Sequence, residues 1–335
     1  MKAAVFDAER ERVEIQSLPD PRPGADELLV RICRCGVCGS DVSMTSPGAF
    51  KFQTGRFGHE YAGEVIEVGA AVRSHRVGDR IAAIPVIGCG SCEACARGNP
   101  LLCPSQASSM FGFGELAVIP PKVAIRLPSS LSFADGALIE PFACGLHAMR
   151  LARLEPGARV LILGAGSMAL AAAYWARKLG AGRIVVLSRS TRRRESVLAM
   201  GADAVLGFDP DDQARVPEVL GGRPDVVADC VGKPETIPLA ATLARGGGTV
   251  LGMGMCTQPV TVLPALFNFS GLHLIFPIGY TANEFEATAR TFDAGRIDPA
   301  AIVSDVIPLE QLPARLDAMR RGDGGGLKVH VDLAA

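Results

Sequence analysis

An uncharged stretch from Val160 to Ala176 limits the possible folds of this chain more strongly than any other segment. The stretch is slightly too short to span a bilayer, and the turn signal Gly164-Ala165-Gly166 inside it would leave backbone polar groups unpaired in lipid. Apolar residues precede the glycines, and a run of helical composition follows them. The sequence therefore predicts a buried strand that turns sharply into a buried helix.

The residues on either side of this stretch predict two domains of different architecture. Short apolar runs separated by Pro and Gly fill the first 148 residues and indicate a β-rich module, with strands near 28–32, 61–68, 80–84 and 115–119. Strands and helices alternate from Arg159 onward, which is typical of a doubly wound parallel sheet. The expected strands there are 160–163, 183–187, 204–206, 225–229, 249–252 and 274–278, with helices over 168–179, 192–200 and 282–294 and a closing strand at 327–331. The predicted fold class is α/β.

Composition excludes several classes of protein. Apolar residues make up 48 % of the 335 residues, and 34 Lys and Arg nearly balance 35 Asp and Glu. Disorder needs lower hydrophobicity and higher net charge, and nucleic-acid binding needs a basic excess. The N-terminus lacks an apolar run of signal-peptide length. We therefore expect a cytoplasmic protein that binds neither nucleic acid nor membrane.

The glycine turn also predicts a dinucleotide site. Gly164-Ala165-Gly166-Ser167-Met168-Ala169 is G-x-G-x-x-G with Ala at the last position. The first Gly permits the tight turn and the second lets the backbone approach a pyrophosphate, whereas the third only permits close helix packing. We expect Gly164, Gly166, Ser167 and Met168 to bind the cofactor.

The end of the following strand favours NADP over NAD. NAD enzymes place an acidic residue there to bind the ribose 2′-hydroxyl, but this strand ends in Ser188-Arg189, with Arg193 shortly after. This end of the strand carries no carboxylate that would repel a 2′-phosphate. The guanidinium of Arg189 could bind such a phosphate through two parallel hydrogen bonds. The alternative is a solvated basic helix start, which does not explain the missing acid.

Four of the ten cysteines form a compact motif. Cys89, Cys92, Cys95 and Cys103 have the spacing C-x2-C-x2-C-x7-C in a glycine-containing loop. Four thiolates suit tetrahedral Zn²⁺ and leave no open position for chemistry, so the predicted role is structural. A bacterial iron–sulfur motif would need three residues before the last Cys, where this loop has seven.

A second set of residues predicts a metal site with an open position. Cys38 lies in Gly36-Val37-Cys38-Gly39-Ser40-Asp41, and Gly58-His59-Glu60 and Ile139-Glu140-Pro141 follow later in the chain. One Cys, one His and a carboxylate, with a fourth position left to water, match catalytic zinc. Taken singly, His59 and Glu140 could also be buried structural residues.

Together these motifs resemble the medium-chain alcohol dehydrogenase family. The segment Gly58–Gly69 resembles its zinc signature, and the Cys38 motif, the four-cysteine loop, Val77-Gly78-Asp79-Arg80 and Gly326-Leu327-Lys328-Val329 match the same family in order. Glu140-Pro141 in place of a third cysteine resembles the sorbitol, threonine and polyol dehydrogenase branch. The resemblance implies a GroES-like catalytic domain (1–148 and 286–335) and a Rossmann cofactor domain (149–285).

The resemblance also implies roles for individual residues. Cys38, His59 and Glu60 would ligate the catalytic zinc, and Glu140 would hold the zinc-bound water or exchange with Glu60. Zinc would act as a Lewis acid on an alcohol, whose hydride passes to the nicotinamide. Ser40 would take the alcohol proton. Many relatives have a histidine three positions later, where this chain has Ser43, so the usual proton relay is in doubt.

The sequence leaves the substrate and the partners open. We expect a polyol, sugar or cyclitol-like secondary alcohol, with a bulkier apolar or aromatic alcohol as the alternative within the enzyme class. A non-catalytic NADP-binding protein is the alternative of another class. No Asp, Glu, Lys or Arg occurs from Gly246 to Asn283, and Leu272–Ile278 resembles the family edge strand that pairs across a twofold axis. We therefore expect a homodimer or homotetramer.

Overall fold

The computed structural model describes residues 1–46, 52–295, 297–298, 301–323 and 326–334. The chain forms two compact units, the first from Met1–Glu140 with Tyr280–Ala335 and the second from Pro141–Gly279. These crossings fall a few residues before the predicted boundaries at 148/149 and 285/286. Helix α3 (Phe133–Leu151) continues through the first crossing, so no local change in composition marks it.

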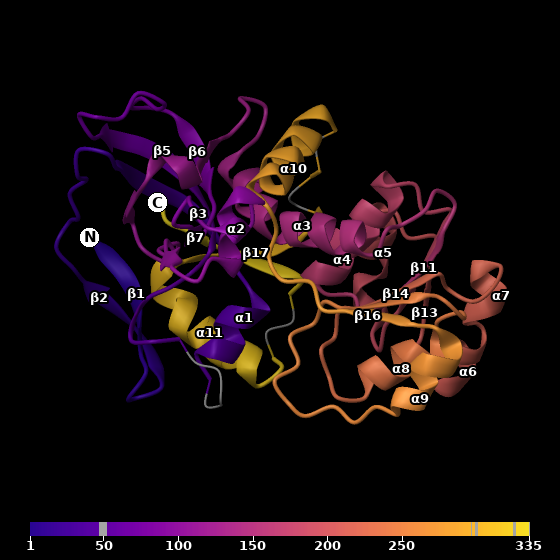
Figure 1. The fold of residues 1–335 in the computed structure, drawn as a ribbon. Coiled ribbons are helices and arrows are strands. Elements are labelled where there is room, and N and C mark those ends of the chain that lie inside the picture. Colours follow the sequence, from indigo (N-terminus) through magenta and orange to yellow (C-terminus); the bar gives the residue numbers. More distant parts are fainter. Residues whose placement is uncertain (47–51, 296, 299–300, 324–325, 335) are drawn as a thin grey trace. The chain divides into compact units, whose positions relative to one another are not determined.

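The first unit is rich in β-strands, as the apolar runs predicted, and its strands pair antiparallel except for the parallel pair β17–β18 (Figure 1). Its main sheet has the order β10-β6-β5-β3-β18-β17, with β9 paired to β3 beside β18. A second sheet has the order β2-β1-β4, and β7 pairs with β8. The strands are β1 (Lys2–Asp7), β2 (Arg12–Ser17), β3 (Leu28–Val37), β4 (Gly55–Arg56), β5 (Glu60–Val68), β6 (Arg80–Ala83), β7 (Val86–Ile87), β8 (Ala107–Ser108), β9 (Leu116–Ile119), β10 (Ala124–Arg126), β17 (Val303–Pro308) and β18 (Lys328–Asp332).

Short helices connect these strands. They are α1 (Gly39–Met44), α2 (Glu93–Ala96), α10 (Ala282–Ala294), α11 (Leu312–Arg320) and the 3₁₀ turns η1 (Pro100–Leu102), η2 (Pro121–Val123) and η5 (Leu309–Gln311). The N-terminal part of α3 packs closely on β5 because Gly136 has no side chain. A Cβ there would lie 2.7 Å from the Cβ of Ala62 on β5. Glu140 lies one helical turn further along the same face of α3.

The second unit is a six-stranded parallel sheet with helices on both faces, which confirms the predicted class (Figure 1). Its order is β13-β12-β11-β14-β15-β16, with strands β11 (Arg159–Leu163), β12 (Arg183–Leu187), β13 (Ala204–Leu206), β14 (Val226–Asp229), β15 (Thr249–Gly252) and β16 (His273–Ile275). The helices are α4 (Ser167–Lys178), α5 (Arg194–Ala199), α6 (Pro210–Ala214), α7 (Val216–Leu220), α8 (Thr236–Leu243), α9 (Pro264–Ser270) and the 3₁₀ turn η3 (Thr191–Arg193).

Buried aliphatic side chains hold this sheet to its helices. Leu161 and Leu163 of β11 share one cluster with Val216 of α7 and Ile237 of α8. The predicted strand at 274–278 is shorter in the structure, and the predicted helix at 192–200 begins as the turn η3. Within the residues described, the chain has no helix that combines the length and the apolarity needed to cross a membrane.

Candidate functional site

One cluster of metal-ligating side chains lies in the first unit, where β3 ends and β5 begins. Cys38, His59 and Glu60 each place one ligand atom within 4.8 Å of the other two. Cys38 follows β3, and Glu60 is the first residue of β5. These strands pair antiparallel, with Gly36 opposite Glu60. Strand pairing therefore joins residues that are distant in the sequence.

A buried ion pair fixes the Glu60 carboxylate. Gly36 provides the space, because a Cβ there would lie 2.1 Å from Oε2 of Glu60. Lys328 of β18 places its Nζ 2.7 Å from both Glu60 oxygens and also donates to the Val37 carbonyl. Burial alone would lower the pKa of Lys328, but the negative charge of Glu60 raises it. The ammonium group therefore stays charged inside the unit.

Asp41 orients the imidazole of His59. The Asp41 side chain is fully buried, and its Oδ2 accepts a hydrogen bond from the backbone N–H of Cys38 at 2.9 Å. Its Oδ1 lies 3.2 Å from Nδ1 of His59, and the Ser40 hydroxyl lies 3.4 Å from Nε2. Burial alone would lower the pKa of His59, but Asp41 and Cys38 raise it well above its usual value. The surroundings of the ring thus favour positive charge.

Glu140 lies outside the three-residue set but acts on the same groups. Its side chain is only 8 % exposed. Burial raises the pKa of Glu140 to about 7; the charges of His59 and Lys328 oppose the rise, and that of Glu60 adds to it. The neighbouring Tyr280 side chain also opposes the rise. Which carboxylate completes a metal site, Glu60 or Glu140, stays a prediction.

The donors of this cluster fit zinc. A thiolate, an imidazole and a carboxylate are the ligand types that Zn²⁺ prefers, and three protein ligands leave a fourth position for water or substrate. A carboxylate behind the ligand histidine, as Asp41 provides, fixes the ring orientation and tautomer in such sites. The set can therefore hold a metal ion that still accepts a substrate oxygen.

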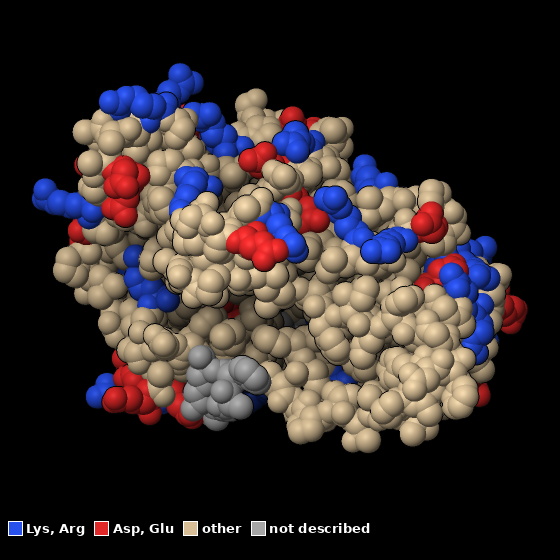
Figure 2. All heavy atoms as spheres, viewed as in Figure 1, with Lys and Arg blue, Asp and Glu red and all other residues tan. Residues whose placement is uncertain are grey.

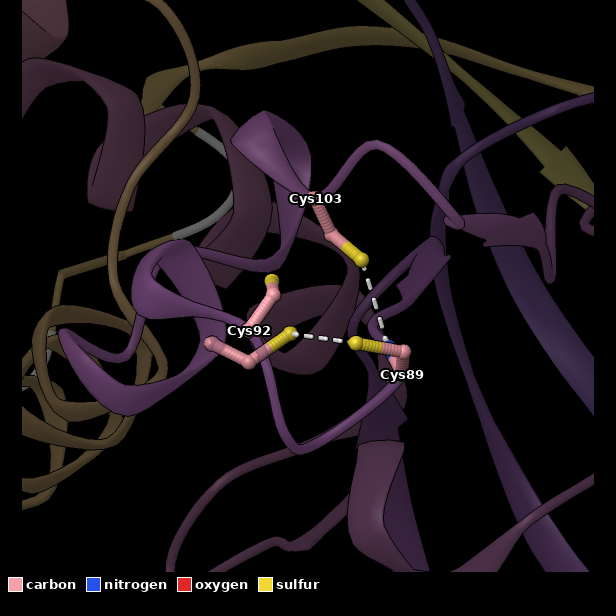
Figure 3. Close-up of side chains that lie close together, drawn as sticks. Cys89, Cys92 and Cys103 are labelled. Atoms are coloured by element: carbon pink, nitrogen blue, oxygen red, sulfur yellow. Dashed lines mark hydrogen bonds between the residues drawn. The ribbon is translucent and has the colours of Figure 1, made fainter.

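The four predicted loop cysteines come together in a second cluster. Their sulfur atoms all lie within 4.8 Å of one another, and Cys89 and Cys95 are 4.0 Å apart. Figure 3 shows the thiols of Cys89 and Cys103 turned toward a common space, with Cys92 beside them. Tetrahedral Zn–S bonds of about 2.3 Å would place sulfurs about 3.8 Å apart. The cluster thus has the dimensions of a four-thiolate zinc site.

Backbone hydrogen bonds in this loop act to lower the pKa of Cys89 and Cys95. Hydrogen bonds from the backbone of Ser91 and from its side chain lower the pKa of Cys89 to about 5. At Cys95 a backbone hydrogen bond from Gly90 has the same effect, but burial and the neighbouring thiols outweigh it and raise the pKa to about 11. Thiolates held this closely repel one another, and a bound cation would relieve that repulsion.

In the second unit, the glycine turn lines a hollow of about 430 Å³. Gly164 has φ +97°, a conformation that favours glycine, and links β11 to the turn before α4. Gly166 caps α4, where a Cβ would meet no atom closer than 3.9 Å. Ser167 and Met168 form the first turn of α4, so their backbone N–H groups are available to a phosphate. Ala169 is fully buried.

Basic side chains surround this hollow. Its lining includes Arg189, Arg192, Arg193 and Lys233, with Glu235 as the acidic residue. Ser188 directly follows β12, and its hydroxyl donates a hydrogen bond to the Ser190 carbonyl at 3.0 Å. Arg193 donates to the Ala165 carbonyl at 3.4 Å, so it lies over the glycine turn. The charge of the hollow suits an anionic ligand such as a dinucleotide.

A larger hollow of about 860 Å³ lies at the other edge of the same sheet, beside Ala158, Val226, Thr249 and His273. These residues precede or begin parallel strands. In open α/β sheets, ligands bind outside the carboxyl ends of the strands. The position in the sheet, rather than the volume, therefore favours the smaller hollow as the candidate dinucleotide site.

Sequence reasoning missed the roles of Asp41, Lys328 and Tyr280. A lysine within the apolar run of the closing strand was a usable signal, because a buried Lys needs an acidic partner. Asp41 three residues after Cys38 has the spacing of a helix cap, which its hydrogen bond confirms. No sequence pattern pointed to Tyr280.

Comparison with known proteins agrees with this description. Residues 24–129 match the alcohol dehydrogenase GroES-like domain, and residues 164–294 match the zinc-binding dehydrogenase domain. The sorbitol dehydrogenase of Bacillus subtilis (strain 168) is 32 % identical over 96 % of this chain and 93 % of its own. The chain therefore belongs to the zinc-dependent medium-chain alcohol dehydrogenase family.

Two solved structures extend the comparison. A zinc-binding dehydrogenase of Sinorhizobium meliloti 1021, bound to NADP, is 30 % identical with a TM-score of 0.87, covering 99 % of this chain and 98 % of that one. A protein of Escherichia coli CFT073 described as a short chain alcohol dehydrogenase, complexed with NADH, is 25 % identical with a TM-score of 0.88, covering 99 % of each. This chain is an NAD(P)-dependent alcohol oxidoreductase of the sorbitol dehydrogenase-like branch.

The Glu60–Lys328 pair leads to a testable prediction about stability. Replacing Lys328 with Met leaves a buried carboxylate without a cation, which costs about 3–5 kcal/mol of the free energy of unfolding. The double substitution Glu60→Gln with Lys328→Met should recover part of this loss, because no buried charge remains. Calorimetric unfolding of the purified variants measures both effects.

The exposed pair Lys2–Glu310 is the matched control, since it has the same 2.7 Å separation. Lys2→Met should leave the unfolding temperature unchanged because solvent screens that pair. Equal effects of the two Met substitutions would contradict the interpretation.

Proposed function

We propose that this chain is a zinc-dependent dehydrogenase of a polyol-like secondary alcohol that uses NADP. The observation that carries the proposal is the open cluster of Cys38, His59 and Glu60 with Glu140 beside it. Three protein donors can hold the metal and leave room for an alcohol oxygen. The similarity to the sorbitol dehydrogenase of B. subtilis, whose name specifies a polyol, supports the substrate class.

Each chain would hold two zinc ions. Cys38 and His59 would bind the catalytic ion, with Glu60 or Glu140 as the carboxylate partner. The structural ion would lie among Cys89, Cys92, Cys95 and Cys103. When bound, the catalytic zinc supplies Lewis-acid polarisation of the alcohol oxygen. The nicotinamide supplies the hydride acceptor.

The protein's own side chains would place and deprotonate the substrate. Asp41 keeps the His59 ring oriented, and Lys328 holds the Glu60 carboxylate in place through contacts of 2.7 Å to both oxygens. Ser40, whose hydroxyl lies 3.4 Å from Nε2 of His59, would accept the proton of the alcohol hydroxyl while passing on its own hydroxyl proton. Ser43 replaces the histidine that many relatives use next, and its hydroxyl donates to the Gly39 carbonyl. The proton therefore leaves Ser40 by a route other than a side chain at position 43.

A substrate panel with metal analysis tests the function. The purified enzyme should contain two zinc ions per chain and oxidise sorbitol or a related polyol faster than benzyl alcohol. Ser40→Ala should lower kcat about 100-fold or more, as expected for loss of a proton-transfer group, with zinc content unchanged. The control Ser43→Ala should retain turnover. A wild-type enzyme with one zinc, or full turnover in Ser40→Ala, would contradict the assignment.

Cofactor preference is tested at the end of β12. Ser188→Asp would place a carboxylate beside the expected 2′-phosphate, so the KM for NADP should rise and that for NAD should fall. Arg189→Ala should weaken NADP binding about 10- to 100-fold, the effect of losing a charge-assisted hydrogen bond, and leave NAD binding unchanged. Fluorescence titration with both dinucleotides measures this. Equal effects on the two cofactors would favour NAD.

We also propose a homodimer or homotetramer that assembles through the second unit. Strand β16 pairs with β15 and ends the sheet, and nearby apolar side chains are exposed, with Phe269 93 % and Phe276 64 % accessible. Figure 2 shows no charged side chain over α9 on the visible face. Exposed apolar surface of this kind marks association sites.

Sedimentation measures the assembly. Phe269→Glu combined with Phe276→Glu should dissociate it, whereas Val306→Glu, an exposed apolar position of the first unit, should not. A monomeric wild-type protein would contradict the proposal.

A further inference from the structure

We propose that Arg320 is a positioning residue that holds helix α1, and thereby Ser40, in place beside the metal-ligating cluster. This inference rests on the proposed function, in which Ser40 accepts the proton of the alcohol. Arg320 is the last residue of α11 and does not belong to the three-residue metal set. Helices α1 and α11 both belong to the first unit and lie side by side (Figure 1).

Helix α1 is held mainly by polar contacts. The structure describes all six of its residues, and among them only Asp41 is buried, so no apolar side chain of this helix is buried. Isolated helices this short are unstable in water. At the N-terminal end, the Asp41 carboxylate accepts from the Cys38 backbone N–H at 2.9 Å and lies 3.2 Å from Nδ1 of His59. The position of α1 therefore also depends on what holds its C-terminal end.

Arg320 makes the contacts at that end. Its Nη2 donates to the Thr45 carbonyl at 3.0 Å and to the Thr45 hydroxyl at 2.7 Å, and its Nε donates to the Ser46 hydroxyl at 3.1 Å. The two hydroxyls donate in turn to backbone carbonyls of α1, Thr45 to Asp41 and Ser46 to Val42, each at 2.6 Å. The last carbonyls of a helix lack partners within it. The guanidinium and the two hydroxyls thus form one hydrogen-bond network over the C-terminal end of α1.

Helix α11 gives the guanidinium a fixed support. Leu312 and Leu316 of this helix are fully buried in the first unit. Asp317, three residues before Arg320, pairs with its Nη1, so all three guanidinium nitrogens have acceptors. The Arg320 side chain is only 22 % exposed, and solvent therefore screens these contacts only in part.

Asp41 connects this network to the metal-ligating cluster. Its backbone carbonyl accepts from the Thr45 hydroxyl, and its carboxylate faces His59. Ser40 precedes it on α1, with its hydroxyl 3.4 Å from Nε2 of His59. Without Arg320, α1 keeps its N-terminal contacts but loses those at its C-terminal end, and Ser40 is less precisely placed. A displacement of about 1 Å at a reacting group can lower a rate about 100-fold.

Arg320→Met tests the proposal because it keeps an unbranched apolar side chain and removes the donors. We expect amide hydrogen exchange in α1 of the zinc-loaded enzyme, followed by mass spectrometry, to quicken about 10-fold or more. We expect kcat to fall about 10-fold or more with the KM for NADP unchanged. Arg320→Lys, which keeps a charged donor, should recover part of both effects.

Arg315→Met is the matched control. Arg315 lies on the same helix, has a side chain 24 % exposed and pairs with Asp305 of β17 instead of α1. Its replacement should leave kcat and the exchange in α1 unchanged. Equal effects of Arg315→Met and Arg320→Met, or faster exchange throughout the first unit in Arg320→Met, would assign Arg320 a general structural role and overturn the inference.

A double-mutant cycle with Ser40→Ala separates the remaining outcomes. If Arg320 acts through Ser40, Arg320→Met should lower kcat no further in the Ser40→Ala background, whereas additive effects would overturn the inference. Unchanged exchange in α1 of Arg320→Met, or faster exchange with normal kcat, would overturn it and leave the proposed function intact. Normal turnover in Ser40→Ala would refute the role of Ser40 in the proposed function and the inference with it.

Discussion

The buried ion pair between Lys328 and Glu60 links the parts of the first unit that form the metal-ligating cluster. It joins the closing strand β18 to the start of β5, across the end of β3 where Gly36 leaves room. A buried pair of this kind is weak evidence for net stability, because desolvation offsets most of the attraction. Its clearer effect is positional: the Glu60 carboxylate is held in place beside Cys38 and His59. The geometry of the metal-ligating cluster therefore depends on strand β18.

This dependence explains why the first unit is discontinuous in sequence. Residues 1–140 supply the thiol, the imidazole and both carboxylates, but the ammonium group that pairs with Glu60 comes from Lys328, after the second unit. In chain order, the whole second unit lies between the metal-ligating residues and the segment that contains Tyr280 and Lys328. The metal-ligating residues alone therefore do not define the geometry of the site.

Local patterns in the sequence predicted most of the fold and the chemical groups of the site. The glycine turn identified the β11–α4 unit because a tight turn and a buried helix leave strong local signals, and the spacing of Cys89, Cys92, Cys95 and Cys103 identified their loop. The partners Asp41, Lys328 and Tyr280 were missed because their roles depend on strand register and helix packing. Only a charged residue in an apolar strand hinted at one of them. Long-range register leaves little trace in a single sequence.

The charged side chains of the two units favour ligands of opposite charge. In the first unit, the buried carboxylates of Asp41 and Glu60 lie in the cluster around His59, and Lys328 pairs with Glu60. Asp41 and Cys38 raise the pKa of His59 against the effect of burial, so the surroundings of the ring favour positive charge, which a bound dication would also supply. In the second unit, arginines and a lysine surround the glycine turn and the N-terminus of α4, where partial positive charge already favours phosphate. One unit thus favours a cation and the other a polyanion, the two charges that a metal-assisted hydride transfer to a dinucleotide requires.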